Sequence, residues 1–251
     1  MTVVFVHGNP ETPAVWDFLA ARLAEAGYAD QIRLSPPGFG SSVPEGFGAT
    51  VYDYRDWLIA ELERIGRPVD LVGHDWGGGH AMNVAMTRPD LLRSWCSDTI
   101  GVFDPAYAWH DLARIWQTPG EGEAWVAGLV ARTSAERAAL LTARGMNSII
   151  AARVASGIDQ TMGACILALY RSAMQPVMAD LGANLEAAAA RPGLVIVATE
   201  DHAVGSEEQR LRTAARAGAR AETLSGDGHW WMTLDEGRRG AAVLEAFWSS
   251  H

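Results

Sequence analysis

Several features that assign chains to other protein classes are scarce or absent here. Only two of the 251 residues are cysteines, Cys96 and Cys165, too few for a disulfide framework or a cysteine-based metal cluster. No apolar run approaches the roughly 18 to 20 residues that a membrane-crossing helix needs. Residues 1–8 lack the basic segment and the cleavage site of a signal peptide. These absences predict a cytoplasmic protein that uses neither the membrane nor disulfide bonds.

Positive charge is also in short supply. The chain has 20 Lys and Arg residues against 30 Asp and Glu residues, which gives a formal net charge of −10. Nucleic acids and anionic membrane surfaces attract basic proteins, so both are excluded as main partners. Small uncharged ligands remain compatible with this charge. The sequence leaves the choice between a monomer and a homodimer open.

Short apolar runs and segments of helical periodicity alternate along most of the chain. The length suits one substantial core, and there are no internal repeats or low-complexity linkers. Strands are predicted at residues 2–6, 31–34, 69–72, 91–97, 194–198 and 221–224. Helices are predicted at 13–26, 51–65, about 79–88, 207–217 and from about 235 onward. This alternation predicts a parallel sheet with helices on both faces.

The alternation stops between residues 103 and 191. This stretch is alanine-rich and has helical periodicity, with turns at Pro119-Gly120 and Met146-Asn147 and no convincing strand. We interpret it as a helical cap. It would be inserted into an α/β core formed by residues 1–102 and 192–251.

The segment Gly73-His74-Asp75-Trp76-Gly77 lies between a predicted strand and a predicted helix. A sharp turn there needs small residues on both sides of a strained central residue. The central side chain then projects at the end of the sheet, beside the first N–H groups of the helix. A lone carboxylate there is normally just a helix cap. In the usual form of this turn the central residue is a serine, so we predict that Asp75 is a nucleophile.

Two later residues are placed to complete a catalytic triad. Asp201 follows a predicted strand, and His229 lies in a glycine-flanked loop before the last helix. The chain order nucleophile, acid, histidine is that of hydrolases with this turn. Glu200, next to Asp201, and Asp98, at the end of an earlier strand, are alternatives for the acid.

With these motifs the chain resembles α/β-hydrolases that use an aspartate nucleophile, namely haloalkane dehalogenases and epoxide hydrolases. The resemblance rests on His7-Gly8-Asn9-Pro10, on Gly73 to Gly78, on Asp201 and on Gly228-His229-Trp230. It covers most of the chain outside the cap. The chain begins almost at the His-Gly strand, so we expect about six strands, fewer than the family norm.

The resemblance implies a reaction at saturated carbon. A carboxylate is a poor acylating nucleophile but can displace a leaving group, which would form an alkyl ester on Asp75. His229 would then deprotonate the water that hydrolyses this ester. By analogy, the backbone N–H groups of Asn9 and Trp76 would hold the oxyanion. No step needs a metal or an organic cofactor, and we expect none.

The two families that the chain resembles differ in how they bind the leaving group. In haloalkane dehalogenases a halide is held by a tryptophan beside the nucleophile and by an asparagine after His-Gly or a second tryptophan. Trp76 and Asn9 stand in those places. In epoxide hydrolases two cap tyrosines hold the ring oxygen. Tyr170 resembles one of them, Leu112 occupies the expected position of the other, and Tyr107 lies five residues earlier. The sequence favours a halide and keeps an epoxide as the alternative.

The cap is rich in aromatic residues. Those that face the cleft would line an apolar pocket for a small uncharged apolar substrate, with Trp109 and Trp116 as candidates and Trp230 beside them. His110 and Asp111 could serve as polar donors in the cap, but we expect them to face solvent. A non-catalytic small-molecule-binding protein of the same fold is an alternative hypothesis. Such a protein would have no turnover, whereas this chain retains the predicted nucleophile, base and acid. An esterase or lyase would ordinarily carry a serine in the turn.

Overall fold

The structure is a computed structural model that describes residues 1–251. Six strands form one sheet in the order β2-β1-β3-β4-β5-β6, and every neighbouring pair is parallel. Their bounds are β1 Val3–Val6, β2 Gln31–Leu34, β3 Val69–Gly73, β4 Leu92–Ser97, β5 Gly193–Ala198 and β6 Arg220–Leu224. The number and direction of the strands confirm the predicted α/β fold with a parallel sheet of about six strands.

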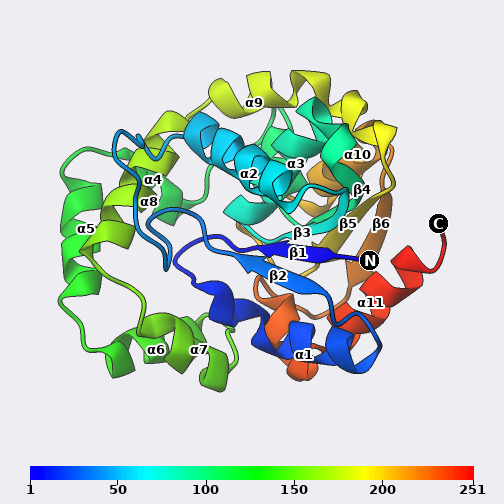
Figure 1. Ribbon diagram of the computed structural model, residues 1–251. Helices are drawn as coiled ribbons and strands as arrows, with labels where there is room; N and C mark the ends of the chain where they lie inside the picture. Colours follow the sequence, from blue (N-terminus) through cyan, green and yellow to red (C-terminus); the bar gives the residue numbers. More distant parts are fainter.

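Helices cover both faces of the sheet. Figure 1 shows α1 and α11 on one side and α2, α3 and α10 on the other. Their bounds are α1 Asp17–Glu25, α2 Val51–Ile65, α3 Trp76–Thr87, α10 Glu207–Arg216 and α11 Arg238–Trp248. Helix α2 begins and ends where its sequence dictates, with a capping box between Thr50 and Asp53 and a left-handed Gly66 after its last residue. None of the helices is long and apolar enough to cross a membrane.

Every regular element between β4 and β5 is helical. These elements are η3 Ile100–Phe103, α4 Asp111–Gln117, α5 Glu121–Val130, α6 Ser134–Ala143, α7 Ser148–Ala155, α8 Gln160–Ser172, α9 Val177–Leu181 and η4 Gly182–Ala190. The turns at Pro119-Gly120 and Met146-Asn147 separate α4 from α5 and α6 from α7. We call residues 103–191 the helical insertion. That they form a cap domain with these boundaries stays a prediction.

Two predicted helices start differently in the structure. The helix expected at 13–26 begins as a 3-10 turn, η1 Pro13–Trp16, before α1. The last helix starts at Arg238, because a 3-10 segment, η5 Trp231–Gly237, comes before it and has positive φ at its end. Gly237 packs directly on α1, where a Cβ atom would lie 2.6 Å from the backbone nitrogen of Leu19. That close approach sets the start of α11.

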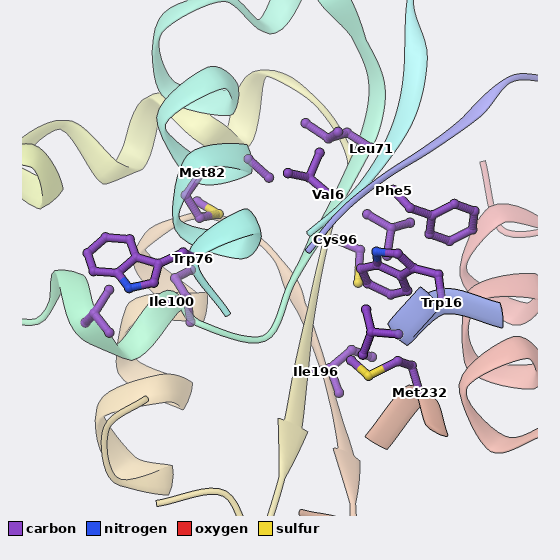
Figure 2. Close-up of a cluster of buried hydrophobic side chains, with 14 of the residues drawn as sticks. Phe5, Val6, Trp16, Leu71, Trp76, Met82, Cys96, Ile100, Ile196 and Met232 are labelled. Atoms are coloured by element: carbon purple, nitrogen blue, oxygen red, sulfur yellow. The ribbon is translucent and has the colours of Figure 1, made fainter. Parts of the chain in front are cut away.

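The sheet is packed on both faces. Every residue of β1 and β3 is buried. Figure 2 shows Phe5 and Trp16 on one side of these strands and Met82 on the α3 side. Burying each such side chain contributes roughly 1.5–3 kcal/mol. The sheet is thus a rigid platform for the loops at the carboxyl ends of its strands, where open parallel sheets bind ligands.

Candidate active site

Asp75 lies at a strained position between β3 and α3. Its backbone has φ 48° and ψ −126°, a region that residues with a Cβ atom rarely adopt. A Cβ atom on Gly73 would lie 2.4 Å from the carbonyl oxygen of Gly77, and one on Gly77 would lie 2.1 Å from that of Val6. The two glycines of the turn are therefore required by close backbone approach, and they let the loop that carries Asp75 pack closely against β1.

Replacing Gly77 by alanine is expected to destabilise the protein by about 3 kcal/mol, because the added methyl group meets backbone atoms that cannot move aside. Gly79→Ala is the matched control. Its Cβ would lie 3.8 Å from the Trp76 ring, an ordinary contact, and alanine favours the helix. Chemical denaturation of both variants measures the difference. Equal stabilities would contradict the packing explanation.

The carboxylate of Asp75 is almost completely buried. The backbone N–H of Asn9 donates to its Oδ2 at 2.9 Å. Gly8 lies so close that a Cβ atom on it would be 2.2 Å from the same oxygen. Burial raises the pKa of Asp75 to about 6, while the charges of His229 and His74 act in the opposite direction. The group is therefore ionised at neutral pH, as a nucleophile must be.

His229 pairs with Asp201, and its Nδ1 lies 2.9 Å from Oδ2 of that residue. Burial lowers the pKa of His229, but the charge and hydrogen bond of Asp201 outweigh it and raise the pKa to about 9. Of the two alternative acids, Glu200 is exposed and Asp98 bonds to another histidine. The structure thus brings Asp201 to His229. No hydrogen bond joins His229 to Asp75, although both line one cavity.

A buried charged network lies beneath this pair. His74 is sandwiched between two carboxylates, with Nδ1 at 2.5 Å from Asp98 and Nε2 at 3.0 Å from Glu11. The Trp230 indole donates to Glu11 at 2.6 Å and the Trp231 indole donates to Asp98 at 2.7 Å. Burial lowers the pKa of His74, but the two carboxylates raise it well above its usual value. The network therefore carries a charged imidazolium.

This network ties the two loops of the site together. Asp98 accepts a hydrogen bond from the backbone N–H of Asp75 at 3.0 Å, and Glu11 accepts one from Gly8 at 3.0 Å. The ring of His74 also lies 4.6 Å from that of His229. Ligand atoms of Glu11, His74 and His229 lie within 4.8 Å of one another; Glu11 and His74 are hydrogen-bonded to each other, whereas His229 bonds to Asp201. No role was assigned to Glu11 or His74 from the sequence; the only signal was that Glu11 follows His7-Gly8-Asn9-Pro10 directly and that His74 lies in the glycine-rich turn before Asp75.

A cavity of about 620 Å³ opens above Asp75. Its wall includes Asp75 and His229 at the sheet, together with Tyr170, Trp116 and Leu112 from the helical insertion. Trp230 also borders the cavity, but its indole N–H is used by Glu11.

The donors predicted for the leaving group gather beside Asp75. The side-chain amide of Asn9 donates to the Tyr170 hydroxyl at 3.4 Å, and the Tyr170 ring stands edge-on to that of Trp76 at 5.3 Å. Burial raises the pKa of Tyr170 well above its usual value, although the N–H groups of Asn9 and Trp76 lower it. Tyr107 is not a second donor for the leaving group, because its hydroxyl donates to the carbonyl of Ala203 at 2.7 Å.

The remaining aromatic candidates form a wall around Tyr170. Trp109 stacks on Trp76 at 5.9 Å, and Trp116 packs against Tyr170 at 4.6 Å. Both indole N–H groups are buried without a hydrogen-bond partner. The expectation that His110 faces solvent is wrong: as the residue before α4 it folds back over the helix start and lines the cavity. Its neighbour Asp111 is exposed, as expected.

The similarity of this chain to known proteins extends beyond the residues of the site. The family model described as "Alpha/beta hydrolase family" matches residues 3–246. A haloalkane dehalogenase of Bradyrhizobium diazoefficiens is 29% identical over 141 residues, which are 49% of this chain and 45% of that protein. An epoxide hydrolase of Caballeronia sordidicola is 38% identical over 96 residues, which are 37% of this chain and 29% of that protein. The matched region thus spans less than half the length of these two curated relatives.

Solved structures match over the whole chain. The haloalkane dehalogenase DbeA from Bradyrhizobium elkani superposes with a TM-score of 0.72 and 24% identity, covering 100% of this chain and 91% of that one. A thioesterase domain from the curacin biosynthetic pathway gives a TM-score of 0.71 at 17% identity, covering 97% and 90%. Similarity at such low sequence identity shows the fold alone, because a haloalkane dehalogenase and a thioesterase domain share this fold. The family model, however, covers all six strands and the turn around Asp75, so the chain belongs to the alpha/beta hydrolase family.

Proposed function

We propose that the protein is a haloalkane dehalogenase that works through an ester on Asp75. The placement of Asn9 carries this proposal. Its backbone N–H binds the Asp75 carboxylate, and its side-chain amide donates to the Tyr170 hydroxyl, whose ring stands edge-on to Trp76. N–H donors suit a halide, which departs as an anion and takes no proton. Relatives that bear the name haloalkane dehalogenase support the same reading.

In the first half-reaction an oxygen of Asp75 attacks the carbon that carries the halogen. A carbon–oxygen bond forms, the carbon–halogen bond breaks, and its electron pair leaves with the halide. The amide of Asn9 and the indole of Trp76 would stabilise the departing anion. The aromatic and aliphatic walls from Trp116 and Leu112 suit a small uncharged apolar substrate.

In the second half-reaction a water molecule hydrolyses the ester. His229 would take its proton as general base, and Asp201 would stabilise the imidazolium that forms. The attack places negative charge on the former carboxylate oxygen, beside the backbone N–H of Asn9 and the N-terminus of α3 at Trp76. Losing one such donor typically costs on the order of 100-fold in rate.

Epoxide hydrolysis is the second candidate, and the Tyr170 hydroxyl favours it. Because this hydroxyl accepts a hydrogen bond from Asn9, its own proton is free to be donated to a ring oxygen. A second O–H donor is not present opposite it, since Tyr107 is bonded to Ala203 and Leu112 has no polar group. One O–H donor and two N–H donors would then serve the alkoxide.

Intact-mass spectrometry of His229→Phe tests both candidates. Removing the base should leave the ester on Asp75, because only the second half-reaction needs His229. After incubation with 1-bromobutane, a mass gain of one butyl group without bromine is expected; with styrene oxide, a gain of the whole epoxide would favour the alternative. The double variant with Asp75→Asn is the control and should gain nothing. No adduct with either compound would instead favour a non-catalytic binding protein.

A further inference from the structure

Arg144 borders the main cavity at its opening. It lies in the turn between α6 and α7, two helices of the helical insertion that pack against each other (Figure 1). The residue is exposed to solvent, whereas Asp75, which borders the same cavity, is almost completely buried. Among the residues that line the cavity, Arg144 is the only arginine, and none is a lysine. The cavity therefore runs from a buried carboxylate to an exposed guanidinium.

The turn that carries Arg144 is fixed to the rest of the protein. The side chain of Met146 is buried, and its backbone N–H donates to the carbonyl of Leu141 at 3.1 Å. The backbone N–H of Asn147 donates to the hydroxyl of Thr233 at 3.2 Å. Thr233 lies in η5, just after the loop that carries the proposed general base. These contacts hold the backbone of Arg144 beside the cavity without using its side chain.

The guanidinium of Arg144 has no partner within the protein. Every other arginine of the chain except Arg132 makes an ion pair or a hydrogen bond. Arg132 also lies on the helical insertion but does not border the cavity. Burial and the charge of His229 lower the pKa of His110 to about 4, and Arg144 acts in the same direction. The positive charge of Arg144 therefore reaches into the cavity, where no protein group neutralises it.

The size and the polarity of the cavity indicate a substrate with two different ends. Its volume of about 620 Å³ lies within the range of roughly 300–1,000 Å³ that is typical of pockets for drug-sized ligands. Aromatic side chains such as Trp116 line its buried part, whereas the exposed side chains that line it are Arg144, Glu200 and His202. A substrate that fills this space would place an apolar part toward Asp75 and a polar end at the opening.

We propose that Arg144 binds a carboxylate at the end of the substrate that points away from Asp75. The proposal rests on the function proposed above and names its substrate class, an alkanoic acid with a halogen at the end opposite to the carboxylate. The guanidinium offers two parallel N–H donors that match the two oxygens of a carboxylate. A phosphate dianion fits less well, because one arginine leaves its second charge unpaired near Glu200. An uncharged apolar character then describes only the part of the substrate beside Asp75.

Matched pairs of substrates test the carboxylate site. The pairs are 6-bromohexanoate with 1-bromohexane and 8-bromooctanoate with 1-bromooctane, and the readout is the ratio of kcat/KM for acid over bromoalkane. In Arg144→Gln we expect this ratio to fall about tenfold, mainly through a higher KM for the acid. Arg144→Lys keeps the charge and should recover part of the loss. Arg132→Gln removes the same charge away from the cavity and should leave the ratio unchanged. An equal fall in both glutamine variants, or no fall in Arg144→Gln, would overturn the proposal.

Binding of octanoate, which carries no halogen, gives a readout that does not depend on turnover. Isothermal titration calorimetry should show about tenfold weaker binding to Arg144→Gln and wild-type binding to Arg132→Gln. Added salt should weaken binding to the wild type more than binding to Arg144→Gln, because a charge pair at an exposed opening is screened. Weaker binding to Arg144→Gln with no halide release from any bromo compound would refute the proposed function but keep the carboxylate site. No octanoate binding by the wild type, or equal binding by Arg144→Gln, would overturn the proposal for Arg144.

Discussion

Asp75→Asn is expected to lower the rate of ester formation by at least about 10⁴-fold, since the amide has nearly the same shape as the carboxylate but is not a nucleophile. The Asn9 backbone N–H can still donate to the amide oxygen, so the loop keeps its hydrogen bond. Halide release from a bromoalkane measures the loss. Retention of more than a small fraction of the activity would refute Asp75 as the nucleophile.

The same variant is expected to be more stable than the wild type at pH 8. Burial raises the pKa of Asp75 from 3.8 to about 6 in the folded protein. A raised pKa means that the protonated form favours folding below about pH 4 and that this stabilisation is lost as the pH rises through 6. The difference between these two pKa values corresponds to roughly 3 kcal/mol of folding free energy. The variant gains less than this, because in it His229 loses a charge partner. Asparagine avoids burying the charge at all.

Thermal unfolding at pH 8 and pH 5 measures this difference. The Tm advantage of Asp75→Asn should be larger at pH 8 than at pH 5. Higher stability together with lost activity would separate the chemical role of Asp75 from a structural one. A lower Tm at both pH values would mean that the variant loses activity through damage to the fold.

The number of strands and the sharp turn around Asp75 could be predicted from the sequence because both depend on local patterns. The apolar run of β1 is continuous, as expected for a strand buried on both faces, and β3 is apolar apart from Asp70; both strands are completely buried. The glycines around Asp75 mark a turn that needs close backbone approach, and the structure shows that approach at Gly73 and Gly77. Local patterns of this kind need no knowledge of distant contacts.

Other features depend on contacts between distant segments and could not be predicted from the sequence. The sequence named Asp201 as the acid but could not exclude its neighbour Glu200; in the structure only Asp201 turns inward to His229, while Glu200 is exposed. The pairing of Glu11 with His74 joins residues 63 positions apart. His110 was expected at the surface because a polar residue before a helix usually is, but its ring packs among three aromatic neighbours. Sequence periodicity records which residues are apolar, not which buried polar groups meet.

In the proposed mechanism, the charge state of His229 would make the second half-reaction strongly dependent on pH. Its pKa of about 9 leaves it protonated at pH 7, where it cannot act as a base. Ester formation needs only an ionised Asp75, whose pKa is about 6, so it should change little between pH 7 and 9. Ester hydrolysis should rise about tenfold per pH unit until it levels off at the pKa of His229.

In the proposed mechanism, ester formation would itself shift the pKa of His229. The negative charge of Asp75 is one of the influences that raise the pKa of His229, and the ester removes it. The midpoint of the hydrolysis profile should therefore lie below 9. Rapid-quench measurements of halide and alcohol formation follow the two steps separately. A burst of halide at pH 7 that shrinks toward pH 9 is the expected result, and a burst of constant size would contradict it.

Asp201→Asn tests which acid sets this profile. Asp201 is the strongest influence that raises the pKa of His229, and without it burial lowers the pKa toward or below its usual value. Hydrolysis in the variant should become independent of pH above 7, at a much lower level because the imidazole loses its orienting partner; comparable losses of a triad carboxylate reach about 10⁴-fold. An unchanged midpoint would mean that Glu200 or Asp98 controls the base. Asp98 already has a partner in His74, and Glu200 is exposed, so the structure favours a shifted midpoint.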